Sequence, residues 1–218
     1  MNNILLEILL IGPPILFAIT IHEFAHGFIA DKLGDPTARL SGRLTLNPLA
    51  HLDIIGTLMF FIIHIGWAKP VPVNPNNLQN PRKDMIWVAL AGPVSNLICG
   101  FIFGMLIRGM FFGGLSLFPP EQWGLAIQVL QIVVIINIIL AVFNAIPIFP
   151  LDGYRILTGF LPVQQAYKFS RFAKYGPFVL LAIILIGQTT GFPIFWMIIG
   201  IPVQILYSLF TGQQSLPI

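Results

Sequence analysis

Charged residues are scarce in this sequence: they make up 9% of its 218 residues, whereas hydrophobic residues make up 56%. A water-soluble domain carries about 25% charged residues, which help to cover its surface. Lipid requires no such cover, because apolar side chains and an internally hydrogen-bonded backbone are stable there. The composition, with a mean hydropathy of +0.88, therefore excludes a soluble globular protein and predicts an integral membrane protein in a lipid bilayer.

Cysteines and basic clusters are also nearly absent. The single cysteine, Cys99, excludes an intrachain disulfide framework, and its place in an apolar run indicates a packing role. The 11 basic residues are scattered singly and the net charge is only +3, which argues against nucleic-acid binding. The first residues have neither a basic n-region nor a small-residue cleavage site, so we expect no secretory signal peptide.

Long apolar runs supply the expected membrane spans. Runs at 4–30, 85–112 and 123–148 are each long enough to cross a bilayer as a helix. A last apolar pair follows at 176–187 and 192–210, and the sequence leaves open whether it forms two spans or a hairpin. We expect one integral membrane domain over 1–218, with a core at 4–160 and C-terminal apolar helices at 176–212.

A shorter apolar stretch lies at 54–65, between the first and second long runs. About 12 residues are too few for a helical span and favour a re-entrant or interfacial segment. The proline-rich segment 66–81 that follows cannot be helical. The predicted fold is therefore an all-α multi-span bundle with about four to six transmembrane segments. A small re-entrant or β-hairpin region, embedded in the membrane, lies between its first and second long helices.

The distribution of basic residues predicts the orientation. If 54–65 does not cross the membrane, the segments 31–52, 66–84 and 154–175 lie on one side and hold 10 of the 11 basic residues. The positive-inside rule then makes that side cytosolic, and only Arg108 falls towards the other side. A crossing at 54–65 would weaken this asymmetry, so the charge pattern favours re-entry.

The segment His22-Glu23-Phe24-Ala25-His26 matches the pattern H-E-x-x-H. On a helix, residues at i and i+4 lie on one face, so both imidazoles can bind one zinc ion at about 2.0–2.1 Å. Glu23 lies beside them and can take a proton from the water that attacks a substrate. The alternative is a pair of interfacial histidines without metal, but two histidines and a carboxylate in lipid are costly unless they are functional.

A catalytic zinc ion usually has three protein ligands, so a third must come from elsewhere in the chain. The candidates are Asp31, His51, Asp53, His64 and Asp152. Asp152 is the best placed, because it follows the 123–148 run, which ends on the same expected cytosolic side as His22 and His26. The alternative for Asp152 is an ordinary residue of a Leu-Asp-Gly turn at a helix end.

Five segments carry a resemblance to a known family: HEFAH at 22–26, NPLAHLDIIGT at 47–57, GWAKPVPVN at 66–74, AGPVSN at 91–96 and NAIPIFPLDG at 144–153. Together they resemble the site-2 protease family of intramembrane zinc metalloproteases, over about residues 15–160. The resemblance implies one zinc ion per chain, with His22, His26 and Asp152 as its ligands and Glu23 as the general acid and base.

The same resemblance implies roles for two asparagines and one loop. Asn144 matches an asparagine that helps to position substrate or to stabilise the oxyanion, and Asn96 would be a second polar residue near the site. Ordinary hydrogen bonding between helices is the alternative for both. The segment 66–74 would lie extended in the membrane and receive an unwound substrate by strand addition.

The predicted function is therefore that of an intramembrane zinc metalloprotease, a multi-pass protein of the cell membrane with its active site near the cytosolic side. Its expected substrate is a transmembrane protein. The alternative is a zinc-binding membrane protein or transporter without proteolytic activity, although transporters often contain internal repeats and this sequence shows none. No segment is long enough for a PDZ or CBS module. A regulatory membrane partner, the oligomeric state and the roles of His51 and His64 are left open.

Overall fold

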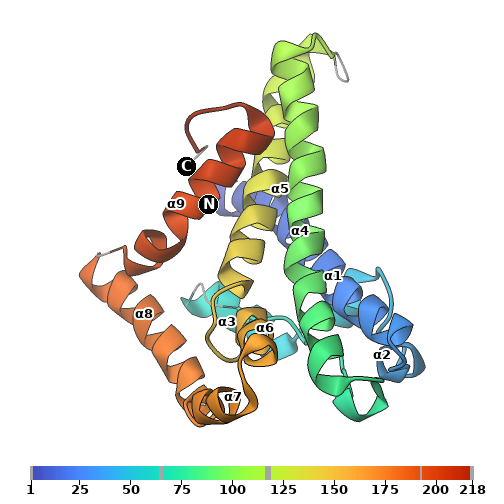
Figure 1. The fold of residues 1–218 in the computed structure, drawn as a ribbon. Coiled ribbons are helices and arrows are strands. Elements are labelled where there is room, and N and C mark those ends of the chain that lie inside the picture. The colour runs from blue at the N-terminus through green and yellow to red at the C-terminus, as the bar shows by residue number, and fades with distance from the viewer. Residues whose placement is uncertain (1, 64–65, 116–118, 192, 217–218) are drawn as a thin grey trace.

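The computed structural model describes residues 2–63, 66–115, 119–191 and 193–216, and Figure 1 shows their arrangement. His64, one of the candidate ligands, lies outside the described residues. The α-helices are α1 (Asn2–Lys32), α2 (Thr37–Leu40), α3 (Ile54–Ile63), α4 (Pro81–Phe112), α5 (Trp123–Asn144), α6 (Asp152–Phe160), α7 (Val163–Ser170), α8 (Gly176–Thr190) and α9 (Ile194–Thr211).

Five helical stretches in the described part of the chain are long and apolar enough to cross a membrane. They are Leu9–Lys32, Pro81–Phe112, Trp123–Asn144, Val163–Gly187 and Ile194–Thr211. The predicted all-α membrane bundle with about four to six spans is therefore confirmed. Local sequence explains where α4 starts: Pro81 stands in its first turn, and Asp84 accepts a hydrogen bond of 2.7 Å from the Asn80 N–H.

Helix α4 is the centre of the bundle and packs against α1, α5, α6 and α9. Towards its C-terminal end, α4 joins α5 and α9 in an apolar core, in which Ile107, Ile138 and Tyr207 are fully buried. Its N-terminal half contacts α1 and α6 instead (Figure 1). The bundle thus has an apolar end around α9, and the polar residues of the sequence motifs gather at the other end.

The region between α1 and α4 contains α3 and, after it, residues 66–74 (the extended segment), which belong to no helix. Helix α3 has 10 residues, which span only about 15 Å and cannot cross a bilayer. Among the described residues this region forms no strands: one antiparallel bridge joins Leu52 and Ala68. The hairpin part of the expectation is therefore not seen as a strand pair, and re-entry into the membrane stays a prediction.

Candidate metal centre

Helices α1 and α6 bring three metal-ligating side chains together. His22 and His26 lie one turn apart on α1, with their ring centroids 4.6 Å apart, and Asp152 is the first residue of α6. Oδ2 of Asp152 lies 3.0 Å from Nε2 of His22 and 3.2 Å from Nε2 of His26. In the part of the chain that the structure describes, these three residues form a group whose ligand atoms all lie within 4.8 Å of one another.

The other candidate ligands that the structure describes are engaged elsewhere. Asp31 pairs with Nε of Arg39 at 2.8 Å. His51 is buried, with its Nε2 2.8 Å from the carbonyl oxygen of Thr45. Asp53 accepts a hydrogen bond of 2.8 Å from the N–H of Gly56 at the start of α3. The order of the spans in the sequence thus pointed to Asp152, the same residue that the structure places beside the two histidines.

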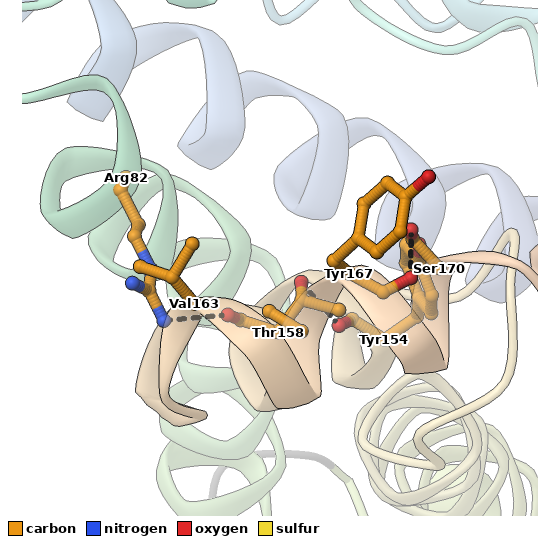
Figure 2. A pocket seen from close by; sticks show the side chains of 7 residues that line it. Arg82, Tyr154, Thr158, Val163, Tyr167 and Ser170 are labelled. Carbon is orange, nitrogen blue, oxygen red and sulfur yellow. Dashed lines mark hydrogen bonds between the residues drawn. The ribbon is translucent and has the colours of Figure 1, made fainter.

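Close packing of α6 sets the position of Asp152. A Cβ atom on Gly153 would collide with the carbonyl oxygen of Ala145, so only glycine lets the start of α6 approach the end of α5 this closely. On the other side, Figure 2 shows Arg82 of α4 reaching the carbonyl oxygen of Thr158 on α6, at 3.4 Å. The neighbours on both sides thus hold the helix that carries the third ligand.

Hydrogen bonds settle which ring nitrogen of each histidine faces Asp152. Nδ1 of His26 lies 2.7 Å from the carbonyl oxygen of Val88, and Nδ1 of His22 lies 2.6 Å from Oδ1 of Asn96. Both partners are oxygens that only accept, so each Nδ1 carries a proton, and in the neutral ring each Nε2 then carries a lone pair. With both rings neutral, two ring nitrogens and a carboxylate oxygen meet with no proton among them.

This donor set fits a zinc ion. Oδ2 of Asp152 is buried and has no hydrogen-bond partner among the described residues, although two ring nitrogens lie within 3.2 Å. Such a meeting of lone pairs is costly unless a cation satisfies them. A tetrahedral ion with bonds of about 2.0–2.1 Å separates its ligands by about 3.3 Å, close to the observed distances.

Gly92 on α4 leaves the room that an ion needs. A Cβ atom there would lie 2.5 Å from Nε2 of His26 and 2.6 Å from Nε2 of His22. Any larger residue would therefore push into the space between the two ring nitrogens. Sequence reasoning missed the role of this glycine, although its position four residues before Asn96 places both on one face of α4.

Glu23 points from α1 to the extended segment that follows α3. Its Oε2 accepts a hydrogen bond of 2.8 Å from the N–H of Val71. Glu23 and Val71 line a cavity of about 150 Å³ together with His22, His26, Pro70, Val73, Val88, Ala89, Asn144, Pro150, Asp152 and Arg155. Asn144 donates one hydrogen bond of 3.0 Å to the carbonyl oxygen of Leu140, and its amide nitrogen has a second hydrogen to offer. The structure thus brings every candidate catalytic residue to one cavity.

Asp35 holds the C-terminal end of the extended segment through hydrogen bonds. Its fully buried carboxylate accepts hydrogen bonds from the N–H of Asn74 at 2.6 Å and from Nδ2 of Asn77 at 2.8 Å. Burial alone would raise the pKa of this carboxyl, but hydrogen bonds from Thr37, Asn77 and Asn74 outweigh burial and lower it. Sequence reasoning missed this residue, because two of its partners, Asn74 and Asn77, lie 39 and 42 positions away.

A larger cavity, of about 350 Å³, lies away from this chemistry. Figure 2 shows it at the junction of α4, α6 and α7, lined by Arg82, Tyr154, Thr158, Val163, Ala166, Tyr167 and Ser170. Its lining contains no histidine, cysteine or carboxylate. Cavity size therefore does not identify the functional site, and the convergence of ligand atoms does.

Comparisons with known proteins point in one direction. The model of peptidase family M50 matches residues 118–187, which include Asn144 and Asp152. A Bacillus subtilis relative named "Putative zinc metalloprotease YwhC" is 37% identical over 198 residues, which cover 91% of this chain and 89% of the relative. The Methanocaldococcus jannaschii relative "Zinc metalloprotease MJ0392" is 26% identical over 78% of this chain and 40% of its own length. No solved structure matches.

Proposed function

The chain belongs to peptidase family M50, the site-2 protease family, and is an intramembrane zinc metalloprotease; we propose that His22, His26 and Asp152 hold its zinc ion and that Glu23 moves the protons of peptide hydrolysis. The observation that carries this proposal is the meeting of two Nε2 lone pairs and the Asp152 carboxylate oxygen within 3.2 Å. A zinc transporter without proteolytic activity would leave Glu23, which lines the same cavity, without a role.

Glu23 acts as the general base and then as the general acid. Zinc, when bound, acidifies water and polarises the carbonyl group of the scissile peptide. The Glu23 carboxylate takes a proton from the attacking water and then delivers it to the nitrogen of the leaving amine. Val71 orients this carboxylate through the hydrogen bond of its N–H to Oε2. The second amide hydrogen of Asn144 is available to the oxyanion that develops on the substrate.

The substrate we propose is a transmembrane segment of another protein, which unwinds before cleavage. Helical backbone hides its carbonyl groups, whereas extended backbone exposes them. The extended residues around Val71 lie beside Glu23 and offer an edge to such a strand. Pro70 and Pro72 have no N–H and the N–H of Val71 donates to Glu23, so this edge offers the N–H of Val73 and the carbonyl oxygens of its residues. Strand addition at Val71 and Val73 would place the substrate backbone over the zinc ligands.

The site opens, in this proposal, towards the cytosolic side of the cell membrane. Lys32 ends α1 and Arg82 lies in the first turn of α4, at the same end of the bundle as Asp152 and α6 (Figure 1). Arg108 lies near the opposite end of α4. Since basic residues favour the cytosolic side, the end that carries the metal centre faces the cytosol and receives water from it.

Zinc content and cleavage, measured together, test the proposed roles. The wild type, Glu23→Gln and Asp152→Ala are purified in detergent, loaded with zinc, dialysed and assayed on a transmembrane peptide substrate. Glu23→Gln should keep one zinc ion per chain and lose cleavage, because it removes the proton acceptor and no ligand. Asp152→Ala should lose both. Cleavage at the wild-type rate by Glu23→Gln would contradict the mechanism.

A further inference from the structure

Two asparagines form a buried polar chain that ends on His22. Asn137 on α5 and Asn96 on α4 are both fully buried. Nδ2 of Asn137 donates to the carbonyl oxygen of Val133 at 2.8 Å. Nδ2 of Asn96 donates to Oδ1 of Asn137 at 2.9 Å and to the carbonyl oxygen of Ala18 at 3.0 Å. Oδ1 of Asn96 lies 2.6 Å from Nδ1 of His22. The chain therefore links α5, α4 and α1.

The direction of every hydrogen bond in this chain is fixed. The backbone carbonyls of Val133 and Ala18 can only accept, so the amide nitrogens of Asn137 and Asn96 must face them. The amide oxygen of Asn137 then faces Asn96, and that of Asn96 faces His22. Turning either amide around would bring two acceptors together in a buried place and leave a donor without a partner. One arrangement remains, and it requires the proton of His22 on Nδ1.

We propose that Asn96 and Asn137 are positioning residues that hold His22 in the tautomer with a bare Nε2, directed at Asp152. This inference rests on the proposed role of His22 as a zinc ligand. A ligating histidine commonly donates its other ring N–H to a carboxylate or a backbone carbonyl, which fixes its tautomer. His26 uses the carbonyl of Val88 for this purpose. His22 uses an amide oxygen, which accepts the same bond without a further buried charge at membrane depth.

A packing role for the asparagines makes a different prediction. Hydrogen bonds between helices are common in membrane bundles and stabilise them modestly. If Asn96 and Asn137 did only this, their loss would lower stability and leave the protonation pattern of the imidazole unchanged. Which ring nitrogen of His22 carries the proton therefore distinguishes the two roles, and this can be measured before any metal is added.

The experiment measures the ¹⁵N chemical shifts of histidine rings in the metal-free full-length chain, in detergent, at a pH where histidine is neutral. The His22 signals are assigned by their loss in His22→Ala. In the wild type we expect a protonated Nδ1 and a bare Nε2. Asn96→Leu should shift His22 towards the tautomer with the proton on Nε2. Asn137→Leu should produce a smaller shift in the same direction, and it serves as the test if Asn96→Leu does not fold.

Asn137→Asp is the conservative control. A buried, neutral aspartic acid keeps an O–H for the carbonyl of Val133 and a carbonyl oxygen for Nδ2 of Asn96, so this variant should retain the wild-type tautomer. Zinc titration against a competing chelator provides the second measurement. Asn96→Leu should weaken zinc binding by about 10- to 100-fold, and Asn137→Asp by less than threefold.

The outcomes distinguish this inference from the proposed function. A wild-type His22 with its proton on Nε2 overturns the inference, whatever the protein does with zinc. Unchanged ring shifts and zinc affinity in both leucine variants overturn it as well. Zinc binding by His22→Ala at wild-type affinity overturns the assignment of His22 as a ligand instead, and the tautomer measurement still decides whether the asparagines orient its ring.

Discussion

A Cβ atom on Gly92 would lie 2.5 Å from Nε2 of His26, inside the space that the metal centre encloses. The site therefore requires a residue without a side chain at position 92 as well as the three proposed ligands. Helix α4 therefore contributes two features to the centre from one face: room at Gly92 and, one turn later, a hydrogen-bond acceptor at Asn96.

Gly92→Ala should weaken zinc binding by about 10- to 100-fold, because its methyl group displaces the two ring nitrogens from their positions. Gly100→Ala is the matched control on the same helix, since a Cβ there would meet the side chains of Ile138, at 3.3 Å, and Phe210, at 3.6 Å, and no metal ligand. Chelator competition on both purified variants measures the effect. Equal zinc affinity in the two variants would show that the space beside Gly92 is not where zinc binds.

Val71→Pro should lower the rate of peptide cleavage by about 10- to 100-fold, because proline has no N–H to orient the Glu23 carboxylate. Residue 71 lies outside every helix and strand of the structure, so a proline there interrupts no helix or ladder. Val71→Ala shortens the side chain and keeps the N–H, so it should retain most of the activity. Both variants should bind zinc as the wild type does. Equally reduced cleavage rates in both would assign the effect to the lost side chain.

Asp35→Asn should destabilise the fold by about 1–3 kcal/mol, because an amide cannot accept hydrogen bonds with both of its terminal atoms. Asp31→Asn removes only a partly exposed ion pair with Arg39 and should cost about 0–1 kcal/mol. Thermal unfolding in detergent, followed by circular dichroism, compares the two variants. A larger loss in Asp31→Asn would contradict the importance of the Asp35 contacts.

The Asp35 carboxylate should also make the stability of the fold depend on pH. The pKa of Asp35 is lower in the folded protein than its ordinary value. Its contribution is therefore fully present above the unfolded pKa of about 3.9 and is lost as the pH falls through the lowered folded value. Acidification below about pH 4 should thus narrow the stability difference between the wild type and Asp35→Asn. A difference that stays constant down to the lowest pH at which the protein folds would contradict the pKa shift.

Trp67→Cys in a Cys99→Ser background tests the orientation of the extended segment. Trp67 is half exposed, so a thiol at this position should react with a water-soluble maleimide. Inverted vesicles should label it and intact cells should not, because the proposal places this segment on the cytosolic side. Arg108→Cys, near the other end of α4, serves as the opposite control. Labelling of residue 67 only from outside the cell would overturn the re-entrant prediction.

Sequence patterns predicted much of the fold and the proposed ligands for particular reasons. Apolar run length reports membrane spans directly, because the bilayer sets a minimum length for a helix. The i, i+4 spacing of His22 and His26 and the cytosolic end of the 123–148 run were enough to bring Asp152 to them. The predicted hairpin did not extend beyond the Leu52–Ala68 bridge, because Pro70 and Pro72 have no N–H with which to continue a ladder.

Contacts between segments far apart in the sequence could not be predicted from such patterns. The bond from Val71 to Glu23 joins residues 48 positions apart, and the bond from Asn74 to Asp35 joins residues 39 apart. Both depend on the path of the connecting segments, which no periodic pattern specifies. The place of Gly92 depends on how α4 is rotated against α1, and an almost uniformly apolar helix gives little indication of its rotation.

X-ray absorption at the zinc edge tests the proposed metal centre most directly, because it reports the ligands of the ion. The measurement uses the purified chain loaded with one equivalent of zinc, alongside Asp152→Ala. The proposal predicts scattering from two imidazole rings with nitrogen and oxygen ligands at about 2.0–2.2 Å, and a changed or lost site in the variant. Scattering from a single imidazole, or from sulfur at about 2.3 Å, would contradict it.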